Sequence, residues 1–470
     1  LEDVTAKLWD ALLEGLIIPK AETCNVLYES LNQDVIDINT YSDHKYKQEY
    51  KFVHDRVQQA AYTLISEEEK QLTHLKIGNL LFESTPIVQR EERVFELVKQ
   101  FNVAIDLITE QTRRDELAEM NLTAGHKAMA STAYSAAFNY LNIGIELLAE
   151  NTWETKYELT LALHETAAEA AYLSGEFKRA EELIDKVLVH AKTLLEQVKV
   201  YQISIETYKA QSQATEAIQV GLTVLGLLGV KLPEKPKQED IDILFQKTRL
   251  ALAGKEIKNF INLPNMNNQE KLIVMNVLVR LLPITAVTNQ ALFNLIVLKQ
   301  LNLSLEYGNC AASAMSYGTY GIALNSNYED IDSSYQYGQL ALGVLEKFNN
   351  HIFKSIVLFV VNTFLVGWKQ HIKETIKPLL NAYLIGLDAG DLEHAAYSAY
   401  MYVEHSFWVG KNLLDLEKET AQYHAKIINI QQDMPLQTLA INWQTILILL
   451  GAAEHRFYLK SEIYDENIML

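Results

Sequence analysis

The amino-acid sequence predicts an all-α protein, built as an α-α superhelix with a small winged-helix remnant at its N-terminus. Three observations support this fold class. The 470 residues include only 8 Pro and 19 Gly, so we expect long helices with short connections. From residue 67 onwards only helical periodicity is present. A two-helix pattern also recurs along the chain, which is typical of a helical repeat array.

Residues 1–66 differ from the rest. A helical pattern ends near Gly15, and a short apolar run stops at Pro19. The segment "VIDINTYSDHKYKQEYKFVHD" then alternates apolar and polar residues around a turn-rich centre, as a β-hairpin would. One face of a further helix carries Val53, Val57, Ala61 and Leu64. A helix, a two-stranded wing and a second helix predict a winged-helix-like unit over residues 1–66.

The remainder begins with "SEEEK", which predicts an N-cap at Ser66 followed by carboxylates in the first helical turn. A buried stripe follows at Val94, Leu97, Val98, Phe101, Ile105 and Ile108. Helix pairs then align with small residues at Gly125 and Ala168, aromatics at Tyr134 and Phe177, and alanines at Ala137, Ala180 and Ala217. Since a small residue lets one helix approach the next, the pattern predicts degenerate tetratricopeptide-like pairs.

The clearest break is "LGVKLPEKPKQED" (Leu228–Asp240), with two prolines and mixed charges. We therefore expect a first array over residues 67–230, a linker and connecting helix over 231–265, and a second array over 266–470. The second array should contain a helix pair with Tyr328 and Ile331 at the aromatic and alanine positions of the repeat, and further pairs that turn near Gly367 and Gly410. Because the pattern runs to the end of the sequence, and because the chain begins at Leu1, we expect an excised segment of a larger protein.

Composition limits the partners. Apolar residues make up 49% and charged residues 21%, which is the balance of a folded chain. The net charge of −19 argues against nucleic acid and against anionic membranes as partners. Cys24 and Cys310 form neither a disulfide framework nor a zinc set, which favours a cytoplasmic location. No signal peptide is evident, and the longest apolar run (Ser355–Trp368) is too short to span a bilayer, so we expect a buried helix there.

A search for catalytic motifs finds none. There is no phosphate-binding G-x-x-x-x-G-K-[ST], no kinase glycine loop or D-F-G, no G-x-S-x-G and no H-x-x-x-H pair. We therefore predict no catalytic residue, no metal site and no cofactor in this segment. His164-Glu165 is superficially like the phosphoacceptor box of histidine kinases, but the basic residue, Thr and Pro that should follow are missing.

One aromatic stripe is a candidate ligand groove: Tyr397, Tyr400, Glu404, His405 and Trp408, with Met401 among them. The alternative is that these side chains pack against the next repeat, which is the commoner role of aromatics at helical spacing. The same two interpretations apply to Tyr317, Tyr320, Tyr335 and Tyr337.

The stretch "YKFVHDRVQQAAYTLI" resembles the end of the winged-helix domain in STAND-type P-loop ATPases. Further along, "LAEMNLTAGHKAMASTAYSAAFNYLNIGIELL", "TWETKYELTLALHETAAEAAYLSGEFKRAEELI" and "SAMSYGTYGIAL" look like the helical region of cyanobacterial-type multi-sensor signal transduction multi-kinases. This resemblance implies a parent chain with a serine/threonine kinase, a STAND P-loop ATPase, a GAF domain and a histidine kinase. ATP and Mg would be bound, and a phosphorelay carried out, by those other domains.

By this resemblance His54 would contact nucleotide in the parent chain, with Asp55 and Arg56 as its local partners. A His at a helix start can donate to phosphate. The alternative is that His54 and Asp55 cap the helix, while Arg56 pairs with a carboxylate. Since the phosphate-binding loop is missing, we predict no ATP binding by this segment alone.

The function that follows is a non-catalytic sensor or scaffold. Its concave face would bind a protein partner, a ligand or another domain of the same chain, and so regulate the ATPase and kinase domains. One alternative is the sensor arm of a STAND-type transcription activator. A third hypothesis makes the segment an enzyme with a pocket at Glu404 and His405.

Overall fold

The computed structural model describes residue 8 and residues 11–19, 50–430 and 432–453. Over these residues the protein is all-α with many packed helix pairs, as the sequence predicts; the strands in this part of the chain are two of three residues each. The chain divides into two compact units. Unit 1 comprises residues 1–124 and 143–150, and unit 2 comprises residues 125–142 and 151–470.

Unit 1 begins with an antiparallel ribbon in which Ile17 pairs with Phe52 and Pro19 with Tyr50. The first strand of the predicted hairpin lies outside the described residues, and a winged-helix unit is not shown. The elements of this unit are β1 Ile17–Pro19, β2 Tyr50–Phe52, α3 Asp55–Thr63, α4 Glu67–Ser84, α5 Ile87–Arg90, α6 Val94–Val103, η2 Ile105–Leu107 and the first part of α7 Gln111–Ala130.

Local sequence signals place two of these helices. Ser66 caps α4: its hydroxyl accepts from the Glu69 backbone N–H at 3.3 Å, and the Glu69 carboxylate accepts from the Ser66 N–H at 3.3 Å. The predicted stripe on α6 is confirmed, because Val94, Leu97 and Phe101 are buried. By contrast, α3 forms as predicted but none of its residues is buried.

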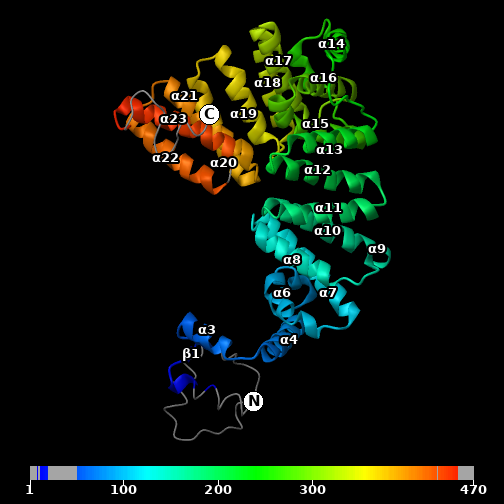
Figure 1. Ribbon diagram of the computed structural model, residues 1–470, viewed down its shortest axis with the longest axis vertical. Coiled ribbons are helices and arrows are strands. Elements are labelled where there is room, and N and C mark those ends of the chain that lie inside the picture. The colour runs from blue at the N-terminus through cyan, green and yellow to red at the C-terminus, as the bar shows by residue number, and fades with distance from the viewer. Residues whose placement is uncertain (1–7, 9–10, 20–49, 431, 454–470) are drawn as a thin grey trace. The chain divides into compact units, whose positions relative to one another are not determined.

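Unit 2 contains successive packed helices (Figure 1), and the pairs that pack most extensively are α10–α11, α12–α13, α17–α18, α19–α20, α20–α21 and α22–α23. Its helices are α8 Tyr134–Leu147, α9 Thr152–Thr155, α10 Tyr157–Leu173, α11 Phe177–His190, α12 Leu194–Ala210, α13 Ala214–Leu227, α14 Gln238–Leu252, η3 Ile257–Asn262, α15 Gln269–Thr288, α16 Gln290–Tyr307, α17 Ser313–Tyr328, α18 Ile331–Phe348, α19 Lys354–Phe364, η4 Val366–Trp368, α20 Lys373–Ala389, α21 Leu392–Trp408, α22 Leu413–Asn429 and α23 Asp433–Leu450. The last residues of α8 belong to unit 1.

The small residues of the predicted repeat lie at helix contacts. A Cβ added at Gly125 would be 2.5 Å from the Leu141 side chain, so the missing side chain is what admits this leucine. Ala137, Ala180 and Ala217 are fully buried, as is Ala168. The explanation of these positions by close helix approach is therefore confirmed.

Two large cores organise unit 2. One extends from Val198 to Val366 and includes most buried side chains of α15 to α18. The other extends from Leu379 to Ile446 and is formed by α20 to α23. The break at residues 228–237 separates α13 from α14, as the prolines predict.

Two apolar helices lie inside this unit. The run at residues 355–368 forms most of α19 and the short helix η4, with Ile356, Val357, Val360 and Val361 buried. In the described part of the chain one helix, α15, is long and apolar enough to cross a membrane by length and composition. In this structure its side chains, Met275 and Leu278 among them, belong to the larger core.

Candidate functional site

The predicted aromatic stripe lies on α21, and its side chains contact different neighbours. Tyr397 packs on Phe359 of α19, with ring centroids 5.7 Å apart. Tyr400 is hydrogen-bonded to Glu404 one turn further on; burial, reinforced by this carboxylate, raises the pKa of the Tyr400 hydroxyl. Trp408 is 65% exposed and meets only the edge of Phe407 among the aromatic contacts described.

His405 is a buried link between two helices. Its Nδ1 lies 2.6 Å from Oγ1 of Thr375, and that hydroxyl donates its single proton to the Ile372 carbonyl oxygen at 2.6 Å. The His405 Nδ1–H must therefore be the donor to Thr375. Burial lowers the pKa of His405, with Glu404 opposing the shift, and the neutral ring fits this arrangement. This geometry gives His405 a packing role at the start of α20.

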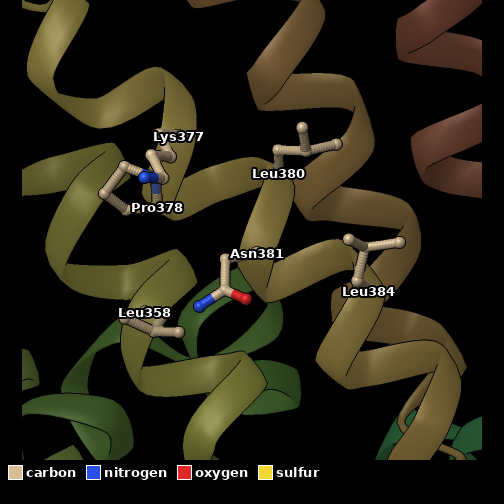
Figure 2. Close-up of a pocket in the computed structure, with 6 residues that line it drawn as sticks. All are labelled: Leu358, Lys377, Pro378, Leu380, Asn381 and Leu384. Carbon is tan, nitrogen blue, oxygen red and sulfur yellow. The ribbon is translucent and has the colours of Figure 1, made fainter.

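An open groove, which we call the α19–α20 groove, lies between α19 and α20. Its volume is about 470 Å³, and it is lined by Leu358, Lys377, Pro378, Leu380, Asn381 and Leu384. Figure 2 shows Leu358 on α19 and the other five spaced along α20. Leu384 is 51% exposed, so much of its aliphatic side chain faces water inside the groove. Such a surface can bind an apolar segment, with Lys377 and Asn381 as polar contacts at its rim.

The groove follows from the two apolar faces of α20. One face is buried through Leu379, Ala382, Tyr383 and Gly386. The second face is displaced by one residue: Leu380 is half-buried against the core of α20 to α23, and Leu384 is exposed. The sequence signal for this site is that α20 has more apolar residues than one face can bury. The groove was not among the predicted sites.

His54 and Arg56 lie at the start of α3. His54 is the N-cap, and its Nδ1 accepts a hydrogen bond from the Arg56 backbone N–H at 3.2 Å. Both side chains are exposed. A helix-capping role for His54 is thus present in the structure; nucleotide contact by His54 or Arg56 in a longer chain stays a prediction.

The remaining histidine of interest, His164, lies inside α10. It donates from Nδ1 to the Thr160 carbonyl oxygen at 2.8 Å, and its ring lies 4.9 Å from that of Trp153. Burial lowers its pKa to about 4, while Glu165 pairs with Lys199 at 2.7 Å. A buried, neutral ring is poorly placed to accept a phosphoryl group.

The four tyrosines are core side chains or surface bridges. Tyr317, Tyr320 and Tyr337 are buried, and the Tyr320 and Tyr337 rings meet edge to face at 5.0 Å. The Tyr335 hydroxyl accepts from Gln370 at 2.5 Å. Over the described residues no group of three or more His, Cys, Asp or Glu side chains is placed to hold a metal ion.

Comparison with known proteins gives one curated relative. The chain is 23% identical, over 448 residues, to a protein named hybrid signal transduction histidine kinase G from Dictyostelium discoideum. The match covers 86% of this chain but only 13% of the length of that relative. No protein-family model matches the chain.

Among solved structures, the chain is similar to a signal transduction ATPase with numerous domains (STAND) protein with a tetratricopeptide repeat sensor from Pyrococcus horikoshii. The identity is 13%, the TM-score is 0.37, and the alignment covers 94% of this chain and 59% of that one. Over most of its length the chain is distantly similar to a protein named as a signalling histidine kinase.

Proposed function

We propose that this chain is a non-catalytic sensor or scaffold segment of a larger signal-transduction kinase, and that it regulates ATPase and kinase domains located elsewhere. The observation that carries the proposal is the extent of the curated match. Nearly the whole chain aligns with a protein named as a signalling histidine kinase, yet the aligned part is a small fraction of that relative. ATP, Mg and the phosphotransfer steps would then belong to the rest of the protein.

The α19–α20 groove supports a binding role within this function. Its walls are the aliphatic side chains Leu358, Leu380 and Leu384 with Pro378, and none of its lining residues is acidic. A protein partner, or another domain of the same chain, could place an apolar segment there. Burying exposed leucine surface contributes about 25 cal/mol per Å² to such a contact.

The first test asks whether this chain itself binds nucleotide. Isothermal calorimetry with Mg–ATP on the 470-residue chain should give no binding heat up to millimolar nucleotide. A micromolar affinity would contradict the assignment of nucleotide binding to other domains.

The second test concerns regulation by the groove. In the full-length protein, Leu384→Glu places a carboxylate in the groove, and we expect the rate of autophosphorylation from labelled ATP to change. The matched control is Leu414→Glu, because Leu414 is also exposed but lies on α22, outside the groove. Equal rates in wild type and both variants would rule out regulation through the groove.

A further inference from the structure

A cluster of charged side chains joins helices that are far apart in the sequence of unit 2. The ammonium of Lys209, near the end of α12, lies 3.0 Å from the Glu206 carboxylate and 3.6 Å from the carboxylate of Glu393 at the start of α21. Arg280 of α15 pairs with the other Glu206 oxygen at 2.8 Å. We call Glu206, Lys209, Arg280 and Glu393 the charge cluster.

The cluster is largely removed from water. The side chain of Lys209 is 13% exposed and that of Glu206 is 18% exposed. Burial alone would lower the pKa of Lys209, but the Glu206 and Glu393 carboxylates outweigh it and raise the pKa. For Glu206, burial is outweighed by Lys209 and Arg280, which hold its pKa below the ordinary value. Both groups are therefore charged at neutral pH.

Charge balance indicates what the cluster does. Two carboxylates face two cations, so no net charge is left over to attract an ionic ligand. Beside it, His394 Nδ1 lies 2.8 Å from the Asp391 carboxylate at the start of α21. A neutral, internally satisfied cluster is suited to holding helices together rather than to binding a charged molecule.

The contact between α12 and α21 is made by these side chains at the helix ends. Along their lengths, α12 packs on α10, α11, α13 and α15, whereas α21 packs on α19, α20, α22 and α23. Val198 and Ile205 of α12 belong to the core at 198–366, and the buried apolar side chains of α21 belong to the core at 379–446. Because the direct contact between the two helices is made by these charged side chains, removing one of them should weaken it.

We propose that the Glu206–Lys209–Glu393 bridge, with Arg280 as its second cation, is an electrostatic latch that holds the start of α21 against the end of α12. Release of the latch separates α20–α23 from α12 and gives unit 2 two arrangements. This inference concerns the segment itself and goes beyond the proposed function, which does not specify how the helices rearrange.

Intramolecular energy transfer tests the latch in the 470-residue chain. Dyes are placed at Val189→Cys on α11 and Met434→Cys on α23, two exposed positions, in a Cys24→Ser background; Cys310 is buried. We expect Glu393→Gln to lower the transfer efficiency, because it removes only the link across to α21. Lys209→Ala should lower it too, because it removes the cation that the Glu393 carboxylate contacts.

The matched control is Lys199→Ala, which breaks the ion pair between Lys199 and Glu165 on the neighbouring helices α12 and α10. It should leave the transfer efficiency unchanged. Circular dichroism establishes that each variant is folded. Unchanged transfer efficiency in Glu393→Gln overturns the proposal. A change in Lys209→Ala that Glu393→Gln does not reproduce also overturns it, because the link to α21 would then not be the cause.

Discussion

The α-carbon of Gly308 lies directly against the carbonyl oxygen of Pro264, so that a Cβ at residue 308 would overlap it. Backbone hydrogen bonds join the two chain segments next to this contact. The Asn309 backbone N–H donates to the Pro264 oxygen at 2.7 Å, and the Met266 N–H donates to the Asn309 oxygen at 2.8 Å. Tyr317 donates to the Asn309 side chain at 2.8 Å, which ties this loop to the core.

Gly308→Ala should therefore be among the most destabilising small substitutions in the chain. Gly308 has φ +97°, so strain adds to the overlap, and we expect a loss of about 3 kcal/mol or more in the free energy of unfolding. The control is Gly175→Ala, which has φ +83° but open space around it and should cost about 1 kcal/mol. Equal losses in urea unfolding would contradict the role assigned to Pro264.

The contact between Gly125 and Leu141 predicts a coupled pair of substitutions. Gly125→Ala gains up to about 1 kcal/mol of helix propensity, but its overlap with Leu141 should cost about 1–3 kcal/mol. In a double-mutant cycle, Leu141→Ala should remove most of that overlap. Gly226→Ala, in open space on α13, should instead be neutral or stabilising. Additive effects at residues 125 and 141 would contradict close helix approach at this site.

His164 predicts a dependence of stability on pH. Its pKa in the folded protein is lowered from 6.5 to about 4, so the folded state binds fewer protons than the unfolded state between these values. The contribution of neutral His164 to the free energy of unfolding is complete above pH 6.5. It is lost as the pH falls toward 4, and the total loss is about 3 kcal/mol. His164→Gln should flatten this part of the unfolding curve, whereas His351→Gln, which removes an exposed histidine, should retain it. If the free energy of unfolding of His164→Gln kept the wild-type dependence on pH, that dependence could not be assigned to His164.

Two leucines on α20 should differ sharply although they lie on one helix. Leu379 is fully buried, so Leu379→Ala should lower the free energy of unfolding by about 3 kcal/mol. Leu384 lines the α19–α20 groove, and Leu384→Ala should change it by no more than about 0.5 kcal/mol. Thermal and urea unfolding measure both. A large loss at Leu384 would mean that the groove is filled by side chains of the chain itself.

Local features of the fold could be predicted from sequence because they depend on neighbours in the chain. The capping of α4 by Ser66 needs only residues 66–69, and the small residue at Gly125 acts within one helix pair. The burial of α19 likewise follows from its composition. These features depend on propensity and periodicity, which one sequence displays directly.

Long-range features could not be predicted in the same way. The partner of β2 is β1, which hydropathy does not specify, because pairing of short strands depends on the path of the chain between them. The α19–α20 groove depends on which of two apolar faces of α20 its neighbours cover. The approach of Glu393 to Lys209 depends on the summed rotations of all the intervening helix pairs, and no local motif records it.

The most direct test of the regulatory role is autophosphorylation by the full-length protein carrying Glu393→Gln. Energy transfer first establishes that the substitution separates α21 from α12. We expect the phosphorylation rate then to differ several-fold from that of the wild type and of the Lys199→Ala control, with no ATP bound by the segment. A rate equal to the wild type, in a variant whose latch is open, would contradict the claim that this segment controls the kinase.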